Sequence, residues 1–154
     1  MTSWKNNNLL YSMREASEKT VAKSRKSLDI LINNRIKKQG PNCDLNDIDV
    51  SQITDMSELF SYSKFNGDIS NWDVSNVRNM RGMFMGSKFN GNISHWDVSN
   101  VENMSRMFWG SKFSGNISHW NVSNVENMKY MFKDSPLEGK EPSWYKMYME
   151  STNS

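Results

Sequence analysis

The sequence predicts an α/β solenoid, a stack of 24-residue coils that each contain a short parallel strand, a short helix and a return loop. The main observation is an internal repeat: residues 73–96 read DVSNVRNMRGMFMGSKFNGNISHW and residues 97–120 read DVSNVENMSRMFWGSKFSGNISHW. Weaker copies occupy residues 49–72 and 121–144, and every copy ends in tryptophan. A period in the twenties is typical of solenoids, in which each unit buries its apolar face only against its neighbours.

The second observation is a set of apolar columns at the start of each coil. Their spacing, apolar-x-x-apolar-x-apolar, is typical of the strand in leucine-rich repeats. We expect short strands on the concave side of the stack, with each tryptophan lying on its equivalent in the next coil. The columns are Leu45, Ile69, Ile93 and Ile117; Ile48, Trp72, Trp96 and Trp120; and Val50, Val74, Val98 and Val122.

A helical period follows each predicted strand. In the second copy the inward set is Val77, Met80, Met83 and Phe84, at offsets 0, 3, 6 and 7. Ser99 stands where an N-cap is needed, and Glu102 completes the S-x-x-E pattern of a capping box. A loop of the type S-K-F-N-G then returns the chain to the next strand, with glycine giving the backbone freedom that the turn needs.

Both ends of the stack need caps, because a terminal coil would otherwise expose its apolar face. Residues 1–40 are predicted as a basic helical segment and N-terminal cap, with one helix near residues 8–24 and another that ends at Gly40-Pro41. Residues 41–135 form the leucine-rich-repeat solenoid, and residues 136–154 form a C-terminal cap and tail. The capping side chains are Leu28, Leu31, Ile32 and Ile36 at one end, and Trp144, Tyr145, Met147 and Tyr148 in a short helix at the other.

The repeat W-D-V-S-N-V-x-N-M-x-x-M-F-x-x-S-x-F-N-G-x-I-S resembles that of BspA-like bacterial leucine-rich-repeat proteins. The lead-in R-I-K-K-Q-G-P-N-C-D-L-N-D-I-D-V-S at residues 35–51 is also similar to the segment that precedes such repeats, and the resemblance covers about residues 28–132. Members are described as surface or secreted adhesion proteins, so the resemblance implies a repeat fold that binds other proteins. The start MTSWKNNNLLYS lacks a secretory apolar region, which predicts a short, leaderless member.

Composition favours one soluble domain. The chain has 154 residues and a net charge of +2, and no stretch reaches the roughly 20 apolar residues of a membrane span. Cys43 is the only cysteine, which excludes an intramolecular disulfide and is typical of a cytoplasmic protein.

Charge divides unevenly along the chain. Residues 1–40 carry nine Lys/Arg against three Asp/Glu (+6), whereas residues 41–154 carry ten against fourteen (−4). The basic part is either the solvated face of a helix or a patch that contacts nucleic acid or another acidic partner. Its candidate residues are Lys19, Lys23, Arg25, Lys26, Arg35, Lys37 and Lys38.

The repeats carry no catalytic pattern, so we expect neither an enzyme nor a cofactor. His95 and His119 occupy equivalent outward positions, and two ligands make a poor zinc site, so no metal is predicted. They are a solvent-facing ladder or a partner contact that responds to protonation. The neighbouring column of Asp49, Asp73, Asp97 and Asn121 is expected to accept hydrogen bonds from nearby backbone N–H groups, as Asx turns do, with a bound cation as the alternative.

Two candidate surfaces for a protein partner remain. On the helix face, the positions that differ between copies bring large and charged side chains together, which either form interface hot spots or shield the loop beneath. These are Arg78, Arg81, Met85, Arg106, Trp109 and Tyr130. The rival is the concave strand face, with Asn71, Asp73, His95, Asp97, His119 and Asn121.

The favoured function is a non-enzymatic protein-binding module, an intracellular adaptor or inhibitor of a larger protein from a bacterium or phage. A homodimer is an alternative assembly. The competing functions are a fragment or short member of a bacterial adhesin that binds host proteins, and nucleic-acid contact through the basic N-terminal helices.

Overall fold

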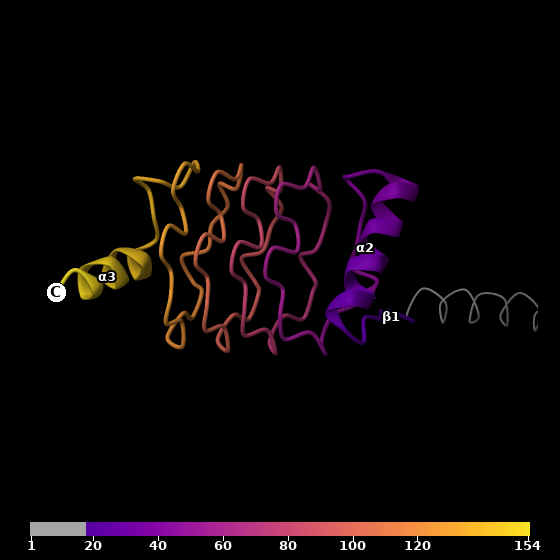
Figure 1. Cartoon of the computed structure of the whole chain (residues 1–154), viewed down its shortest axis with the longest axis horizontal. Helices are drawn as coiled ribbons and strands as arrows, with labels where there is room; N and C mark the ends of the chain where they lie inside the picture. Colours follow the sequence, from indigo (N-terminus) through magenta and orange to yellow (C-terminus); the bar gives the residue numbers. More distant parts are fainter. Residues whose placement is uncertain (1–17) are drawn as a thin grey trace, which may run out of the picture.

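The computed structural model describes residues 18–154, in the order β1 (Thr20–Val21), α2 (Arg25–Gln39), β2 (Ile48–Asp49) and α3 (Ser143–Thr152). β1 and β2 pair in parallel, with Thr20 opposite Ile48. Between β2 and α3 the chain runs back and forth through successive turns, which lie side by side in Figure 1. Helix α2 covers one end of this row, and α3 extends from the other (Figure 1).

The predicted α/β solenoid of leucine-rich-repeat coils is wrong. That fold needs a strand and a helix in every 24-residue copy, whereas the described residues contain two helices and one two-stranded sheet. The segments predicted as helices contain no helix: of residues 77–84, Asn79 forms an isolated bridge and only residues 81–84 lie in turns. Neighbouring copies are linked by single-residue bridges, for example Asn79 with Asn103, in place of the predicted parallel strands.

The helix fails because alternate backbone N–H groups leave their own copy. Gly82 and Phe84 donate to the carbonyls of Ser105 and Met107 in the next copy, both at 2.9 Å, instead of to the fourth residue before them. Left-handed backbone conformations also interrupt the path, with φ of 60° at Gly82 and 64° at Gly86. Such residues do not fit a right-handed helix, so the apolar spacing of 3 and 4 serves consecutive turns.

The predicted capping box is absent, because no helix follows Ser99. Ser99 does not cap a helix; its N–H and its hydroxyl both donate to Oδ1 of Asp97, at 3.0 and 2.6 Å. Serine therefore closes a local turn with the preceding aspartate, and Glu102 forms an ion pair with Arg78 at 2.8 Å.

The predicted inward columns are nevertheless buried. Val77, Met80, Met83 and Phe84 are fully buried, as are their equivalents Val101, Met104, Met107 and Phe108. The expected stacking of tryptophans is confirmed for Trp72 on Trp96 and for Trp120 on Trp144, whose ring centroids are 6.5 Å apart in both pairs. Each indole N–H donates to a carbonyl 27 residues earlier, as Trp96 does to Ile69 at 3.1 Å.

Helix α2 forms the predicted N-terminal cap. Leu28 and Ile32 are buried against the first copy, and the helix ends at Gly40, where φ is 87°. Arg25 donates to the carbonyl of Ser57 at 2.6 Å, and Arg35 forms an ion pair with Asp47 at 2.7 Å. The helix predicted near residues 8–24 lies mostly outside the described residues; its described end, residues 18–24, contains strand β1 and no helix.

Helix α3 is the predicted closing helix at the other end. Tyr145 is buried and packs edge-on against Phe132, with ring centroids 5.0 Å apart. Met147, predicted as part of the cap, is instead 68% exposed. Pro136 takes the position of Lys112, whose N–H bonds to Ser87, and because proline has no N–H this series of bonds ends there.

Substitution of two glycines can distinguish the effect of close packing on stability from that of backbone strain. A Cβ on Gly67 would lie 1.8 Å from the carbonyl oxygen of Cys43, which is fixed by the N–H of Asp68. Gly110 has a φ of 65° but only Gly86 near it, at 4.0 Å. We expect Gly67→Ala to destabilise the protein by about 3 kcal/mol or more, and Gly110→Ala by about 1 kcal/mol. Urea denaturation measures both, and equal losses would contradict this packing.

Candidate functional site

The six residues predicted for a helix face lie on turns, and the structure divides them. Arg78 pairs with Glu102 at 2.8 Å and Arg81 with Glu58 at 2.7 Å, so both guanidinium groups are used between neighbouring copies. Met85 is half-buried. Pairs this exposed contribute little to stability, but they leave the two arginines less available to a partner.

The other three residues come together in an aromatic cluster, defined as Arg106, Trp109, Tyr130, Lys133 and Asp134. Its aromatic rings are 6.0 Å apart, and the Arg106 guanidinium lies 5.2 Å from the Trp109 ring centroid and 5.9 Å from that of Tyr130. The Lys133 ammonium also lies 5.9 Å from the Tyr130 ring. Such distances give cation–π attraction, which holds the flexible basic side chains against rigid rings.

Arg106 differs from the other described arginines in its partners. Arg25, Arg35, Arg78 and Arg81 all form ion pairs. Within residues 18–154, no carboxylate lies within ion-pair distance of Arg106. The guanidinium is therefore positioned by aromatic rings but keeps its charge and its donors for another molecule.

Hydrogen bonding fixes the indole of the aromatic cluster. The Trp109 N–H donates to Oδ2 of Asp134 at 3.1 Å, across neighbouring copies. Arg106 and Tyr130 both have left-handed backbones, with φ of 56° and 58°. This conformation is unfavourable for non-glycine residues and recurs at Gly82, the equivalent position two copies before Tyr130.

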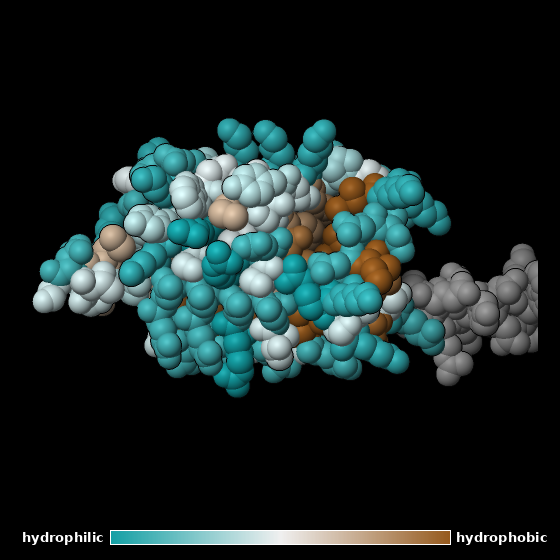
Figure 2. Space-filling model, viewed as in Figure 1, coloured by the Kyte–Doolittle hydropathy of each residue, from teal (hydrophilic) through white to brown (hydrophobic). Residues whose placement is uncertain are grey.

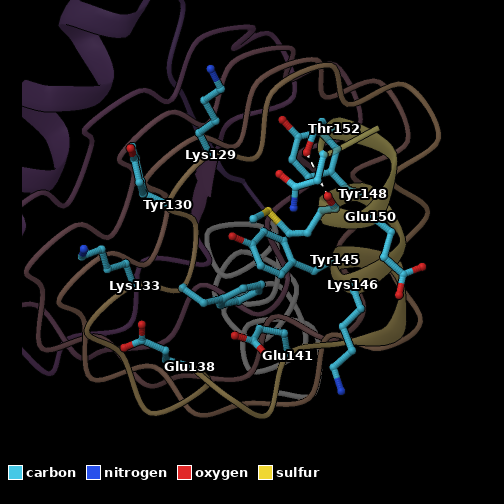
Figure 3. Close-up of a pocket in the computed structure, with 13 residues that line it drawn as sticks. Lys129, Tyr130, Lys133, Glu138, Glu141, Tyr145, Lys146, Tyr148, Glu150 and Thr152 are labelled. Atoms are coloured by element: carbon cyan, nitrogen blue, oxygen red, sulfur yellow. Dashed lines mark hydrogen bonds between the residues drawn. The ribbon is translucent and has the colours of Figure 1, made fainter.

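A groove of about 680 Å³ lies beside the aromatic cluster, between the last copy and α3 (Figure 3). Tyr130 and Lys133 belong to both the groove and the cluster. In Figure 3 the tyrosine rings of α3 face the groove, while Lys146 and Glu150 point outward. The groove is lined by Lys129, Tyr130, Phe132, Lys133, Glu138, Glu141, Tyr145, Lys146, Tyr148, Met149, Glu150, Thr152 and Asn153.

Most of the face in Figure 2 is hydrophilic, and its brown atoms gather beside α2. At that end of the molecule Val21 and Ile30 are 38% and 51% exposed. At the other end, Tyr130 is 52% exposed and Met149 37% exposed. Exposed apolar side chains are thus found at both ends of the row of copies.

The residues predicted for a concave strand face are all exposed, although no strand carries them. They are Asn71, Asp73, His95, Asp97, His119 and Asn121. The predicted Asx turns are confirmed: Oδ1 of Asp73, Asp97 and Asn121 each accepts the N–H of the serine two residues later, at 3.0 to 3.1 Å. No three potential metal ligands gather anywhere in residues 18–154.

Turns of this kind also lower the pKa of Asp97 and of Asp49. Hydrogen bonds from the hydroxyl and the N–H of Ser99 stabilise the ionised Asp97 and lower its pKa below the usual 3.8. Ser51 lowers the pKa of Asp49 in the same way. The serine hydrogen bonds stabilise the charge of each carboxylate and offset repulsion along the column.

The predicted basic patch is divided by structural contacts. Arg25 holds α2 against the first copy through the carbonyl of Ser57, and Arg35 pairs with Asp47 just before that copy. The hydrogen bond from Arg35 to Asp47 raises the pKa of Arg35. The lysines of the patch, Lys19, Lys23, Lys26, Lys37 and Lys38, are exposed. Lys37 and Lys38 lie in the last turn of α2, where cations stabilise the helix dipole.

Sequence reasoning missed two parts of this region. Asp134 and Lys133 were not among the predicted partner-binding residues, although Lys133 occupies the same variable column as Met85 and Trp109. The groove was missed entirely. Its α3 wall depends on how the final helix leaves the last copy, for which the repeat gives no signal.

The chain belongs to a family described as "Mycoplasma protein of unknown function, DUF285", whose model matches residues 31–144. Searches of curated proteins and of solved structures gave no match. In the described part of the chain, neither helix is long and apolar enough to cross a membrane.

Asp97 provides a test of the Asx turns. Asn121 makes the same turn at the equivalent position, so Asp97→Asn should keep the unfolding free energy at neutral pH within about 0.5 kcal/mol. Asp97→Ala should lose about 1 kcal/mol with the hydrogen bonds.

The same variants have a defined pH dependence. Because the folded pKa of Asp97 is depressed, its stabilisation is present above pH 3.8 and is lost as the pH falls through the folded pKa. Denaturation at about pH 6 and about pH 3 measures how much unfolding free energy is lost on acidification. That loss should be smaller for Asp97→Asn than for the unmodified protein. An unchanged acid loss would show that Asp97 does not contribute.

Proposed function

We propose that this chain is a non-enzymatic protein-binding module whose aromatic cluster anchors the partner. The supporting observation is Arg106, which is positioned by Trp109 and Tyr130 and has no carboxylate partner in the described residues. Trp, Tyr and Arg are the residues most enriched at energetic hot spots of protein interfaces.

The physical advantage of the cluster is preorganisation. Arginine loses considerable rotamer freedom when it is fixed at an interface, and binding becomes weaker by that entropy. Here the rings and the Asp134 hydrogen bond restrict Arg106 and Trp109 before binding. A partner with a carboxylate beside an apolar contact suits this arrangement, because the guanidinium can bond a carboxylate through two N–H groups.

The proposed role is that of an adaptor or inhibitor, which acts by occupying a surface of a larger protein. A cytoplasmic location is part of this proposal, since the single cysteine is typical of a reducing compartment. Fractionation of cells that express the native gene, followed by immunoblotting, tests the location. Recovery only in the medium or the membrane fraction would contradict it.

The alternatives have less support. Two of the seven basic-patch residues, Arg25 and Arg35, are used within the molecule, which weakens a nucleic-acid surface at α2. Among the residues predicted for the concave strand face, Asp73 and Asp97 already accept hydrogen bonds from Ser75 and Ser99. The adhesin function implied by the BspA-like resemblance stays a prediction, because the family match names no activity.

Capture of partners from lysate, followed by mass spectrometry, should recover a stoichiometric protein partner. The Arg106→Ala and Trp109→Ala variants should each bind this partner at least about ten-fold more weakly than the unmodified protein. Arg106→Lys keeps the charge but loses planar stacking, and should give an intermediate loss. Lys112→Ala, an exposed cation outside the cluster, is the matched control and should bind normally.

Thermal denaturation of every variant must accompany the capture, so that unfolding is not mistaken for lost binding. A partner that binds the Arg106 and Trp109 variants as tightly as the unmodified protein would exclude the cluster as anchor. Recovery of nucleic acid in place of protein would overturn the proposed function itself.

A further inference from the structure

The groove beside α3 and the aromatic cluster meet at one side chain, Tyr130. Its ring lines the groove, and the Arg106 guanidinium lies 5.9 Å from the centroid of the same ring. The Lys133 ammonium is also 5.9 Å from that centroid, and Lys133 lines the groove as well. A single occupant can therefore contact the groove and both cations at the same time.

The groove offers apolar surface to such an occupant. Phe132 and Tyr145 line it but are almost fully buried, whereas Tyr130 and Met149 remain 52% and 37% exposed. Tyr148 of α3 faces the same space (Figure 3). A volume of about 680 Å³ is within the usual range of ligand pockets. It has room for one large apolar side chain together with the backbone that carries it.

Two of the three glutamates that line the groove are bonded within their own loop. Oε2 of Glu138 accepts the N–H of Asp134, and Oε1 of Glu141 accepts the N–H of Gly139, both at 2.9 Å. Such bonds partly compensate the charge of a carboxylate. The third, Glu150, points outward (Figure 3). The negative charge of the groove is therefore largely used by the protein itself or directed away from an occupant.

The basic groups at this end have no such partners. Across residues 18–154, neither Lys129 nor Lys133 lies within ion-pair distance of a carboxylate, and the same is true of Arg106. Cation–π attraction to Tyr130 restricts Lys133 and Arg106 before anything binds. The charge that remains available is positive, so this end of the molecule is complementary to an acidic occupant.

We propose that the groove and the aromatic cluster together bind one acidic segment of a partner protein. A large apolar side chain of that segment, leucine or phenylalanine, enters the groove against Tyr130 and Met149. A carboxylate close to it in the segment accepts hydrogen bonds from Arg106, with Lys133 as the second cation. This inference rests on the proposed function, because it states the chemistry by which a protein partner is recognised.

The same features disfavour nucleic acid as the occupant. A nucleic-acid strand carries a phosphate at every nucleotide and has no aliphatic side chain to fill the groove. Its phosphates would also approach the carboxylates of Glu138 and Glu141, and like charges brought together weaken binding. An acidic protein segment avoids this cost, because its apolar side chain lies at the groove and its carboxylate lies beside Arg106.

The test uses the synthetic peptide EEDLFGEE, with both termini blocked, as the probe. Two control peptides each remove one half of the recognition: EEDAAGEE lacks the large apolar side chains, and QQNLFGQQ lacks the carboxylates. NMR titration of the whole chain follows the indole N–H of Trp109 and the methyl groups of Met147 and Met149. EEDLFGEE should shift the signals of Trp109 and Met149 together, and each control peptide should bind about five-fold or more weakly.

Two matched pairs of variants locate the binding. Met149 lines the groove, whereas Met147 does not and is 68% exposed. Met149→Gln should weaken binding of EEDLFGEE about five-fold or more, and Met147→Gln less than about two-fold. Lys133→Gln should weaken it about three-fold or more at low salt and less at high salt, because salt screens the attraction. Lys112→Gln, at an exposed lysine outside the groove, should have less than about a two-fold effect.

Thermal denaturation checks that every variant folds. The proposal is overturned if millimolar EEDLFGEE shifts neither reporter, or if either control peptide binds as tightly. A shift of Trp109 without Met149 would likewise remove the groove from the site, and tighter binding of a single-stranded oligothymidylate would replace the acidic segment by nucleic acid. Failure here is distinct from failure of the proposed function. A cellular partner that needs Arg106 and Trp109 but tolerates Met149→Gln retains the aromatic cluster as anchor.

Discussion

The backbone hydrogen bonds between neighbouring copies are the constraint on which the rest of this structure depends. Because alternate N–H groups reach the following copy, each copy must keep the same length and the same turns as its neighbours. The row consequently has a donor end and an acceptor end. Arg25 satisfies a carbonyl at the acceptor end, and Glu138 satisfies an N–H at the donor end, so side chains of opposite charge replace the missing backbone.

Keeping register places equivalent side chains directly beside one another. For aromatic residues this is favourable: Phe60, Phe84, Phe108 and Phe132 lie in succession with centroids 5.7 to 5.8 Å apart. For carboxylates it would be unfavourable, and the serine hydrogen bonds at Asp73 and Asp97 offset it. Columns whose residue is the same in successive copies therefore build the molecule. Columns that vary between copies, such as Gly82, Arg106 and Tyr130, are free to form a surface.

The sequence predicted the burial of the apolar columns and the helices at both ends, because these follow directly from residue type and spacing. The strand and helix within each copy were wrong. Met80, Met83 and Phe84 have helical spacing, but two consecutive turns also direct these positions inward. Glycine at residues 82, 86 and 110 was a signal of left-handed backbone, which Glu58, Tyr62 and Arg106 obscured at equivalent positions. Arg106 and Trp109 were found as variable residues, whereas the groove depends on contacts between the last copy and α3.

The left-handed backbone at Arg106 and Tyr130 has an evolutionary consequence. Glycine occupies this position in an earlier copy without strain, whereas each larger side chain there costs about 1 kcal/mol of folding free energy. Selection for thermal robustness alone would drive both residues to glycine and erase the aromatic surface. Arginine and tyrosine at these positions thus lower the stability of the fold relative to glycine, as expected of residues that serve a surface.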